Sequence, residues 1–567
     1  MKSAFTLLKE SVNSRTRAQY SAICGVSVAV IEALAAELVG HGKKAAVITY
    51  RGAVKHTNGL YNQLAIQHLN TLIGNYDWKG GCTAGAGGLG GNTSGAVSLA
   101  FNGGPPVSGI RIDRAMSFYE ESGALFTGYP AKRPWFPFGT QGNYQELIPS
   151  IEDGYPYPIK VLITYWNAIP YSVPALRPVW ERVMAETALP EVVPATAKVP
   201  LFVAISPVMG EVAAWADYIL PDSTYLEKFA VPGIPWRVNK GTSFQRPVVG
   251  AFDDKAIGSL TGAGNRIADA TNNYTPALSD TKAVADIHIG LAKALGLPGV
   301  GINALGTGRN LNNAWDWAKA MLDNIAFNAS SKYAGLTRDE ILAKGGVFDN
   351  PGEEYSGDLA GSTPNPNGPY LAYKYGNVIR LFVDPVARTR DSVTGRYYAG
   401  VPQYVAPAHS DGTLVNDGTG FPMKLITFKV VHHGQARTAV SPWLMLMSPE
   451  NYVEISAADG SRLGVETGDR VRVTSASNTA GIVGKAKVTQ GLKPGVVAIS
   501  HHFGHWELGS RPHTVNGVQT GFDPSRGAGI HPGTVMRRDR RSANVPLQDP
   551  IGASCSYYDT WVQVRRV

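Results

Sequence analysis

The 567-residue sequence is poor in cysteine. Its three cysteines, Cys24, Cys82 and Cys555, lie far apart, and no two of them are spaced as Cys-x-x-Cys. This spacing excludes a local motif for a structural zinc ion or an iron–sulfur cluster. It also excludes a scaffold held together by disulfide bonds, although it does not identify the redox compartment of the protein.

Long apolar runs and strong charge runs are absent as well. No apolar stretch approaches the roughly 20 residues that a membrane-spanning helix needs, and the first 27 residues predict an amphipathic helical segment rather than a signal peptide. The net charge of +8 is scattered along the chain. Its one basic run, "RRDRR" at 537–541, lacks the interleaved aromatic residues of a nucleic-acid groove. We interpret this run as a solvated loop and expect no nucleic-acid partner.

The common nucleotide-binding and hydrolase motifs are missing. No Walker sequence, HExxH or GxSxG occurs, so these enzyme classes lose support. "GAGGLG" at 85–90 matches the dinucleotide fingerprint GxGxxG, but the pattern predicts no strand before it and no helix after it. We therefore interpret it as a flexible loop. Because glycine has no Cβ, such a loop can still lie close to a bulky ligand.

The first part of the chain has α/β patterning, and the chain length predicts three or four folding units. Residues 27–42 predict a helix that Ser27 caps, residues 44–50 predict a buried strand, and residues 60–74 predict a second helix. Helix, strand and helix at this spacing indicate an α/β unit. An irregular stretch rich in glycine and proline then extends to about residue 157.

A second α/β pattern follows the irregular stretch. In chain order its predicted elements are a strand at 159–166, a helix at 173–187, a strand at 199–206, a short helix at 210–216, a strand at 217–221, and helices at about 281–295 and 311–327. This order predicts doubly wound, mostly parallel sheets. Such sheets bind ligands at the carboxyl ends of their strands.

From Met423 the pattern changes to short apolar runs separated by glycine, asparagine and proline turns. The predicted strands are 424–433, 452–456, 469–477, 481–489, 495–500 and 560–567. Many short strands with turn signals are typical of a compact β-barrel. We therefore divide the chain into an α/β unit over 1–157, a second α/β unit over 158–345, an irregular connection over 346–420 and a β-barrel over 421–567.

Two polar segments follow predicted strands of the second unit. "YWNAIPYS" at 165–172 comes directly after a strand, and its residues fit a ligand-binding loop and an asparagine-capped turn equally well. "ADYILPDSTYLEK" at 216–228 carries Asp217, Asp222 and Glu227. Paired carboxylates can do acid–base chemistry, but without a partner in the sequence we favour acids that cap or flank the strand.

Histidines gather in two patches of the predicted barrel, "HHGQARTAVSPW" at 432–443 and "HHFGHW" at 501–506. Adjacent histidines on a strand point to opposite sides, so His501 and His502 cannot easily bind one metal ion. Imidazole, guanidinium, hydroxyl and indole groups together suit a polar, aromatic ligand that carries phosphate. We therefore favour hydrogen bonding to such a ligand over metal binding, and predict no metal ligands in this chain.

Several segments, in order along nearly the whole chain, resemble the molybdopterin oxidoreductase (dimethyl sulfoxide reductase) family. They are "AICGVSVAVIEALAAEL", "LNTLIGNYDWKGG", "ADYILPDSTYLEK" and the stretch from Met447 to Ser500, which resembles the family's dinucleotide-binding barrel. Within the family, "YPAKRPWFPF", the stretch 145–175 and "NVPLQDPIGASCSYYDT" most resemble catalytic subunits of tetrathionate reductase. Arsenate, thiosulfate and polysulfide reductases are similar neighbours.

The sequence departs from the family at its start. Catalytic subunits of this branch begin with a cysteine cluster for an iron–sulfur centre, followed by a cysteine that binds molybdenum, and both precede the "ICGVS" helix. Cys24 and Cys82 match neither position. The resemblance therefore implies the C-terminal part of a catalytic subunit, inactive alone, with its [4Fe–4S] cluster and molybdenum ligand in a missing N-terminal segment.

The resemblance implies a molybdenum cofactor with two molybdopterin guanine dinucleotides, and the reduction of tetrathionate to thiosulfate. The positions that match the family's motifs imply that three groups of residues contact the cofactor. The nucleotide-tail residues are Asn167, Tyr171, Ser172, Pro221, Asp222 and Glu227. The pterin-loop residues are His433, Gln435, Arg437, Thr438, His501, His502, Gly504, His505 and Trp506. The closing-loop residues are Asn544 and Asp549. Lys160, with Lys132 and Arg133, is the candidate for attracting an anionic substrate.

The family also implies partners and a location. These are an iron–sulfur electron-transfer subunit, a membrane anchor subunit, and a place in the periplasm or on the outer face of the cytoplasmic membrane, without a membrane span in this chain. Two other functions remain open. One is a reductase of arsenate, selenate, thiosulfate or polysulfide, and the other is a non-catalytic chain that binds a nucleotide or assists assembly.

Overall fold

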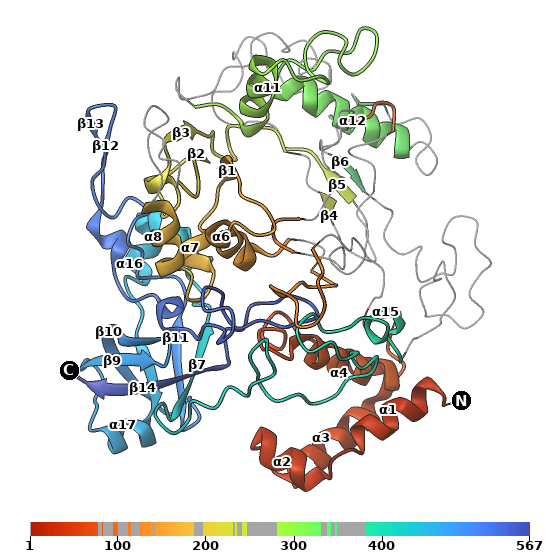
Figure 1. Ribbon diagram of the computed structural model, residues 1–567, viewed down its shortest axis with the longest axis vertical. Helices are drawn as coiled ribbons and strands as arrows, with labels where there is room; N and C mark the ends of the chain where they lie inside the picture. The colour runs from red at the N-terminus through yellow and green to blue at the C-terminus, as the bar shows by residue number, and fades with distance from the viewer. Residues whose placement is uncertain are drawn as a thin grey trace.

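The computed structural model describes residues 2–76, 82, 95–99, 111–114, 125–139, 142–185, 197–230, 233–234, 241–245, 281–329, 337–338, 340–341, 346–348 and 381–567 (Figure 1). The glycine-rich motif at 85–90 lies outside the described residues, as does most of the predicted connection between 346 and 380. Among the described helices, none alone is long and apolar enough to cross a membrane, although Arg17–Cys24 and Val28–Lys44, bent by 104°, pass that test as a pair.

The chain begins with helices. They are α1 (Ala4–Val12), α2 (Arg17–Cys24), α3 (Val28–His41), the short 3-10 helix η1 (Gly42–Lys44) and α4 (Gly59–Leu72). The hydroxyl of Ser27 caps α3 by accepting a hydrogen bond from the Val30 N–H at 3.3 Å. The two helices predicted for this part of the chain are therefore confirmed.

The strand predicted at 44–50 is wrong, because the backbone of this segment pairs with side chains of the helical region. The amide of buried Asn70 on α4 accepts from the Val47 N–H at 2.8 Å and donates to the Val47 carbonyl at 2.9 Å. Asn75 donates to the Ala45 carbonyl at 2.6 Å. Side-chain amides thus satisfy peptide groups that a neighbouring strand would otherwise bind.

A three-stranded parallel sheet forms the middle of the molecule (Figure 1). Its strands are β1 (Val161–Tyr165), β2 (Leu201–Ser206) and β3 (Tyr218–Pro221), in that spatial order. The nearby helices are α6 (Tyr144–Asp153), α7 (Ile169–Ser172), α8 (Arg177–Ala185) and η3 (Ala213–Trp215). Trp180 of α8 packs edge-to-face on Phe202 of β2, and both are fully buried. The helix predicted at 210–216 is only the single turn η3.

Two helices, α11 (Val284–Ala294) and α12 (Ala314–Ala329), lie at one end of the molecule and pack around a second hydrophobic core. The short helix α15 (Asp384–Ala387) comes later in the chain. The small antiparallel sheet contains β4 (Gly233–Ile234), β5 (Gly241–Ser243) and β6 (Gly346–Phe348). In this core, Trp315 of α12 stacks on Phe229, a residue that follows β3 in the chain.

The predicted β-barrel is confirmed. Six strands close it in the order β10-β8-β11-β7-β14-β9. Their bounds are β7 (Met423–Phe428), β8 (Val453–Ser456), β9 (Arg470–Ser475), β10 (Asn478–Thr489), β11 (Val496–Ser500) and β14 (Thr560–Arg566). The alternating apolar residues of these strands point inward, as Leu425, Val471 and Val562 do, and they fill the barrel.

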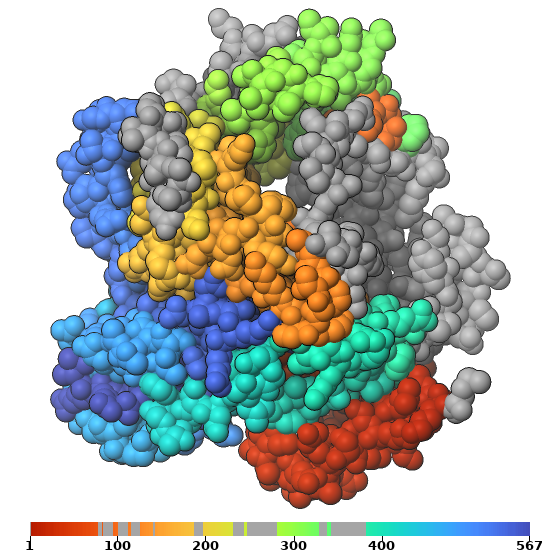
Figure 2. Space-filling view, viewed as in Figure 1, coloured from red at the N-terminus to blue at the C-terminus, as the bar shows by residue number. Residues whose placement is uncertain are grey.

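The remaining elements of the barrel region are short. They are η5 (Thr438–Val440), α16 (Pro442–Met447), α17 (Ala457–Leu463), β12 (Thr514–Val515), β13 (Val518–Gln519), η6 (Pro524–Gly527) and η7 (Pro532–Val535). Figure 2 shows that residues 381–420 lie between the N-terminal helices and the barrel region, so segments far apart in sequence meet here. Asp559, next to β14, binds the Thr57 N–H at 2.7 Å.

Candidate functional site

Tyr171 joins the parallel sheet to the barrel. It belongs to α7, which follows β1, and its hydroxyl lies 2.9 Å from the Phe503 carbonyl and 3.2 Å from the His501 carbonyl. Its ring is sandwiched between His505, at a centroid distance of 4.0 Å, and His531, at 4.2 Å. Burial raises the pKa of Tyr171 well above its usual value, so the phenol keeps the proton that it donates. The structure therefore brings the predicted 165–172 and 501–506 loops together.

The two His-rich loops of the barrel bind each other. His502 Nδ1 lies 2.9 Å from the Gln435 carbonyl and must donate to it, so Nε2 is the acceptor for the Val430 N–H at 3.3 Å. His501 Nε2 lies 3.3 Å from Gln435 Oε1. Burial lowers the pKa of both histidines, to about 4 for His501. Both imidazoles are therefore neutral hydrogen-bonding groups near pH 7.

The turn from His433 to Thr438 is held by a second histidine network. His433 Nε2 donates to the Ser448 carbonyl at 2.9 Å, and its Nδ1 accepts from the Thr438 hydroxyl at 2.9 Å. The same hydroxyl oxygen accepts from the Gly434 N–H at 3.0 Å. These bonds fix the shape of the loop and leave the exposed Arg437 at its surface.

Gly504 allows the close approach of the loop to the residues before η7. Its φ is +74°, and an added Cβ would lie 2.4 Å from the backbone nitrogen of His531. Gly509 has a similar φ of +71°, but there an added Cβ would meet only the flexible end of Arg526. Both glycines therefore adopt a positive φ that disfavours other residues, but only at Gly504 would a side chain collide with backbone atoms.

Gly504→Ala is expected to destabilise the protein by over 1 kcal/mol more than Gly509→Ala. Both changes carry the left-handed strain of roughly 1–3 kcal/mol, but only the first forces the 501–506 loop away from His531. The shift in the urea midpoint, followed by the tryptophan fluorescence of the protein, measures this difference. Equal shifts for the two variants would contradict the close approach.

Asp222 directly follows β3 at the carboxyl edge of the parallel sheet, and it is almost fully buried. Its Oδ2 forms an ion pair with Lys228 Nζ at 2.8 Å and accepts a hydrogen bond from the Trp166 indole. Its Oδ1 has no hydrogen-bond partner among the described residues. Lys228 Nζ also lies 4.7 Å from the centre of the Trp166 ring. This corner combines a buried carboxylate, a cation and an aromatic face.

Other predicted residues of these loops have local partners. Asn167 Oδ1 accepts from the Ile169 N–H at 2.6 Å, as in an asparagine-capped turn. The Ser172 hydroxyl donates to the Ala168 carbonyl at 2.7 Å, and Glu227 accepts from the Thr224 N–H at 2.7 Å. Pro221 is the last residue of β3. Their side chains shape the loops, and their contacts with a ligand stay predictions.

The three candidate cations for substrate attraction lie in different settings. Lys160 is exposed just before β1, at the end of the strand opposite to Trp166. Arg133 is buried, where it pairs with Asp153 at 2.7 Å and donates to Asn544 Oδ1 at 2.7 Å. Lys132 lies over the Tyr155 ring at 4.8 Å. Arg133 is thus neutralised by its partner, so its charge is not free to attract an anion as predicted.

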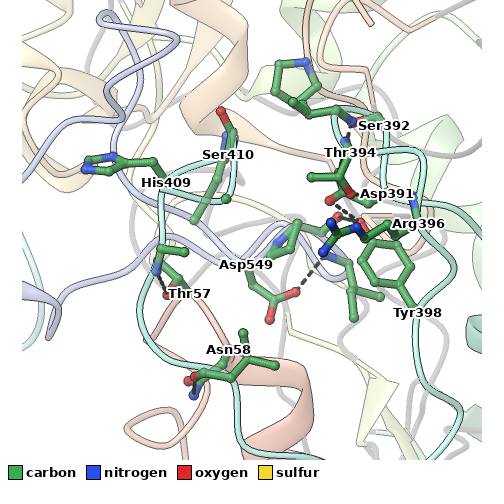
Figure 3. Close-up of a pocket in the computed structure, with 18 of the residues that line it drawn as sticks. Thr57, Asn58, Asp391, Ser392, Thr394, Arg396, Tyr398, His409, Ser410 and Asp549 are labelled. Carbon is green, nitrogen blue, oxygen red and sulfur yellow. Dashed lines mark hydrogen bonds between the residues drawn. The ribbon is translucent and has the colours of Figure 1, made fainter. Parts of the chain in front are cut away.

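Asp549 lines a cavity of about 210 Å³ between α4, residues 391–412 and the closing loop (Figure 3). Its Oδ1 accepts from the N–H groups of Ile551 and Gly552, and its Oδ2 accepts from that of Leu60 at 2.9 Å. Burial raises the pKa of Asp549 in spite of these donors. Figure 3 shows Asp549 in the middle, with Thr57 on one side and Asp391 on the other.

Three residues of the site escaped the sequence analysis. His531, in "GIHPG", stacks on Tyr171, and burial lowers its pKa to about 3. Arg177 lies over the Trp506 ring at 4.2 Å, and Glu211 pairs with His505 at 2.7 Å. Each is a single polar residue in an unremarkable local pattern, so no spacing signal marks it. Within the part of the chain that the structure describes, no three histidine, cysteine or acidic residues form a metal-binding group.

The sequence is similar to known proteins in the barrel region and along the chain. A family model described as "Molydopterin dinucleotide binding domain" matches residues 423–531, which include β7 to β11 and both His-rich loops. A selenate reductase subunit from Mesobacillus selenatarsenatis is 34% identical over 100% of this chain and 55% of that protein. A tetrathionate reductase subunit from Salmonella typhimurium is 33% identical over 94% of this chain and 52% of that protein.

A more distant relative aligns over a similar share of this chain. The molybdopterin-containing subunit of arsenate respiratory reductase from Shewanella sp. is 24% identical over 96% of this chain and 60% of that protein. The chain thus spans about half the length of the curated relatives that it matches. The match of the dinucleotide-binding family model to the barrel and the similarity along the chain to reductase subunits support a relationship to the molybdopterin oxidoreductase family.

Proposed function

We propose that this chain binds a molybdenum cofactor with two molybdopterin guanine dinucleotides and forms part of a respiratory reductase that converts tetrathionate to two thiosulfates. The observation that carries the proposal is that the 501–506 loop contacts both Tyr171 and Gln435 of the other His-rich loop, and both His-rich loops lie in the region matched by a dinucleotide-binding family model. When bound, the cofactor supplies the two-electron chemistry, and the protein binds and orients it.

The donors and acceptors of the described residues fit such a cofactor. A guanine base presents adjacent N–H donors, and the unpartnered Oδ1 of Asp222 is an acceptor at the sheet edge where α/β folds bind nucleotides. The neutral imidazole of His501 can exchange hydrogen bonds with a pterin. We propose that His502, whose two ring nitrogens bond to Gln435 and Val430, supports the shape of this loop beside the pterin. We propose Asn544 and Asp549 as contacts from the closing loop, with Asp549 reaching the cofactor through its cavity.

Asp222→Asn is expected to weaken the binding of guanosine diphosphate by roughly 10- to 100-fold, the usual effect of losing a hydrogen bond to a charged group. Equilibrium dialysis with guanosine and adenosine diphosphates measures the change. Lys228→Gln is the control, because it removes the ion pair and keeps the carboxylate. Equal binding of both nucleotides by the unchanged protein would contradict guanine recognition at Asp222.

The redox function has a separate test. The protein, expressed with any upstream coding sequence, is assayed for molybdenum, guanine nucleotide and iron, and then for oxidation of reduced benzyl viologen with tetrathionate, selenate, arsenate and thiosulfate. We expect tetrathionate to give the fastest turnover. Guanine nucleotide without molybdenum would instead favour a non-catalytic binding or assembly chain.

Selenate reduction is the second candidate, because the selenate reductase relative is as similar to this chain as the tetrathionate reductase relative from Salmonella typhimurium. Faster turnover with selenate would replace the first proposal. Arsenate reduction has weaker support, since the identity to the arsenate enzyme is 24%.

Finer features of the predicted organisation also belong to this proposal. We propose that the barrel has double-psi topology, that the α/β units are doubly wound, and that the units divide at 1–157, 158–345, 346–420 and 421–567. We further propose an iron–sulfur electron-transfer partner and a membrane anchor partner. The expected location is the periplasm or the outer face of the cytoplasmic membrane.

A further inference from the structure

A buried acid–imidazole pair connects the parallel sheet to the barrel. Glu211 lies between β2 and η3, His505 lies in the loop after β11, and both side chains are fully buried. Glu211 Oε1 lies 2.7 Å from His505 Nδ1, although 294 residues separate the two in sequence. Close by, the Gly509 N–H donates to the Met209 carbonyl at 2.8 Å. The pair therefore sits at a contact between the two parts of the fold.

The pair leaves two buried polar atoms without partners. His505 Nε2 and Glu211 Oε2 have no hydrogen-bond partner among the described residues. Since a carboxylate accepts, His505 Nδ1 must donate to it. A buried acceptor without a partner reduces stability, and replacing a buried charged pair with apolar residues is often neutral or stabilising. Stability alone is therefore a poor explanation for this pair.

The orientation of His505 is transmitted to the loop that we assign to the pterin. The His505 ring lies flat on Tyr171, with an angle of 7° between the planes. The Tyr171 hydroxyl in turn contacts the carbonyls of His501 and Phe503. On the next residue, the Trp506 ring is covered by Arg177. A rotation of His505 would remove the flat contact that holds Tyr171 in line with these carbonyls.

We propose that Glu211 is a positioning residue, which fixes the ring plane and the Nδ1–H tautomer of His505 and thereby sets the 501–506 loop for the cofactor. The role of the loop in cofactor binding rests on the proposed function. The claim that Glu211 fixes the orientation of His505 depends only on the contact between these two residues. The role requires an acceptor at Oε1. Glutamine can provide one, and alanine cannot.

The test compares Glu211→Ala and Glu211→Gln in the full chain, with Val212→Ala as the control. Val212, beside Glu211, is also buried but belongs to the apolar core of the sheet, so its truncation lowers stability and keeps the Glu211 carboxylate. Two quantities are measured, the 15N chemical shifts of the histidine side chains and the pterin content per chain. Melting temperatures show how far each variant is destabilised.

In the unchanged protein and in Glu211→Gln, we expect an Nδ1–H signal from His505 in addition to that of His502, and only the His505 signal should be lost in Glu211→Ala. Pterin content should fall about tenfold in Glu211→Ala, the size of one lost charged hydrogen bond. An unchanged tautomer in Glu211→Ala would overturn the inference. So would equal pterin loss in Val212→Ala at the same melting temperature. Absence of pterin from the unchanged protein would overturn the proposed function, and the 15N signals would still decide the role of Glu211.

Discussion

Replacing Glu146 with alanine should destabilise the protein by about 3–5 kcal/mol, the usual cost of removing one partner of a buried ion pair. Glu146 on α6 pairs with Arg114, and both side chains are almost completely shielded from water. The Arg114 guanidinium also donates to the Pro134 carbonyl at 2.9 Å. Without the carboxylate, neutral acceptors such as the Pro134 carbonyl and the Ser150 hydroxyl would remain beside the buried Arg114 cation.

The loss should extend to the closing loop of the barrel. Glu146 accepts a hydrogen bond from Gln548, and neighbouring Gln145 donates to Gln548 at 3.0 Å and to the Ala553 carbonyl. These contacts hold α6 against the loop that contains Asp549. Loss of Glu146 should therefore also loosen one wall of the cavity in Figure 3.

Urea unfolding, followed by the tryptophan fluorescence of the protein, measures the destabilisation by Glu146→Ala. Glu32→Ala is the matched control, because Glu32 forms an exposed ion pair with Arg17 on the N-terminal helices. An exposed pair contributes roughly 0–1 kcal/mol. If the two variants lose the same stability, the Arg114–Glu146 pair does not hold this part of the fold together.

Acid should destabilise the protein through His531. Burial lowers its pKa to about 3, compared with about 6.5 in an unfolded chain. Between these values the unfolded chain binds a proton that the folded chain does not. This contribution is therefore fully present above pH 6.5 and is lost as the pH falls toward 3. The slope is about 1.4 kcal/mol per pH unit for one proton.

His531→Asn should remove this proton and reduce the slope of stability against pH by up to about 1.4 kcal/mol per pH unit. The lowered pKa values of His501 and His502 leave a smaller slope of the same sign. The measurement is the urea midpoint at several values between pH 6.5 and 4.5, a window above the range where the lowered pKa values of Asp539 and Asp559 add their own acid dependence. His41→Asn, at an exposed helix end, should keep the slope of the unchanged protein. Parallel slopes for His531→Asn and the unchanged protein would mean that His531 is protonated in both states.

The barrel could be predicted from the sequence because the pattern that marks each strand lies within the strand and its flanking turns. Alternating apolar residues in β9 and β14 decide which side of each strand is buried, and turn residues separate the runs. The helix α3 was predicted for a similar reason, since Ser27 lies at its start. The segment 44–50 failed because a strand also needs a neighbour. Here Asn70 and Asn75 satisfy its backbone instead.

The candidate site was only partly predictable, because its key contacts join distant residues. Tyr171 was predicted to contact a nucleotide tail, and this stays a prediction. Its position between His505 and His531 depends on residues in the far C-terminal part of the chain. Arg133 was selected for its charge, and nothing in its local sequence indicated the pairing with Asp153. Glu211 had no visible role until the fold brought His505 to it.

The arrangement of the barrel strands also has a consequence for biosynthesis. β7 is the first barrel strand to be made, yet it pairs along one edge with β14, the last, which also closes against β9. On the ribosome, β7 and β9 must therefore wait with open edges until residues 560–566 have emerged. Unpaired strand edges of this kind promote association between nascent chains. Newly made copies should depend on chaperones most strongly during this interval.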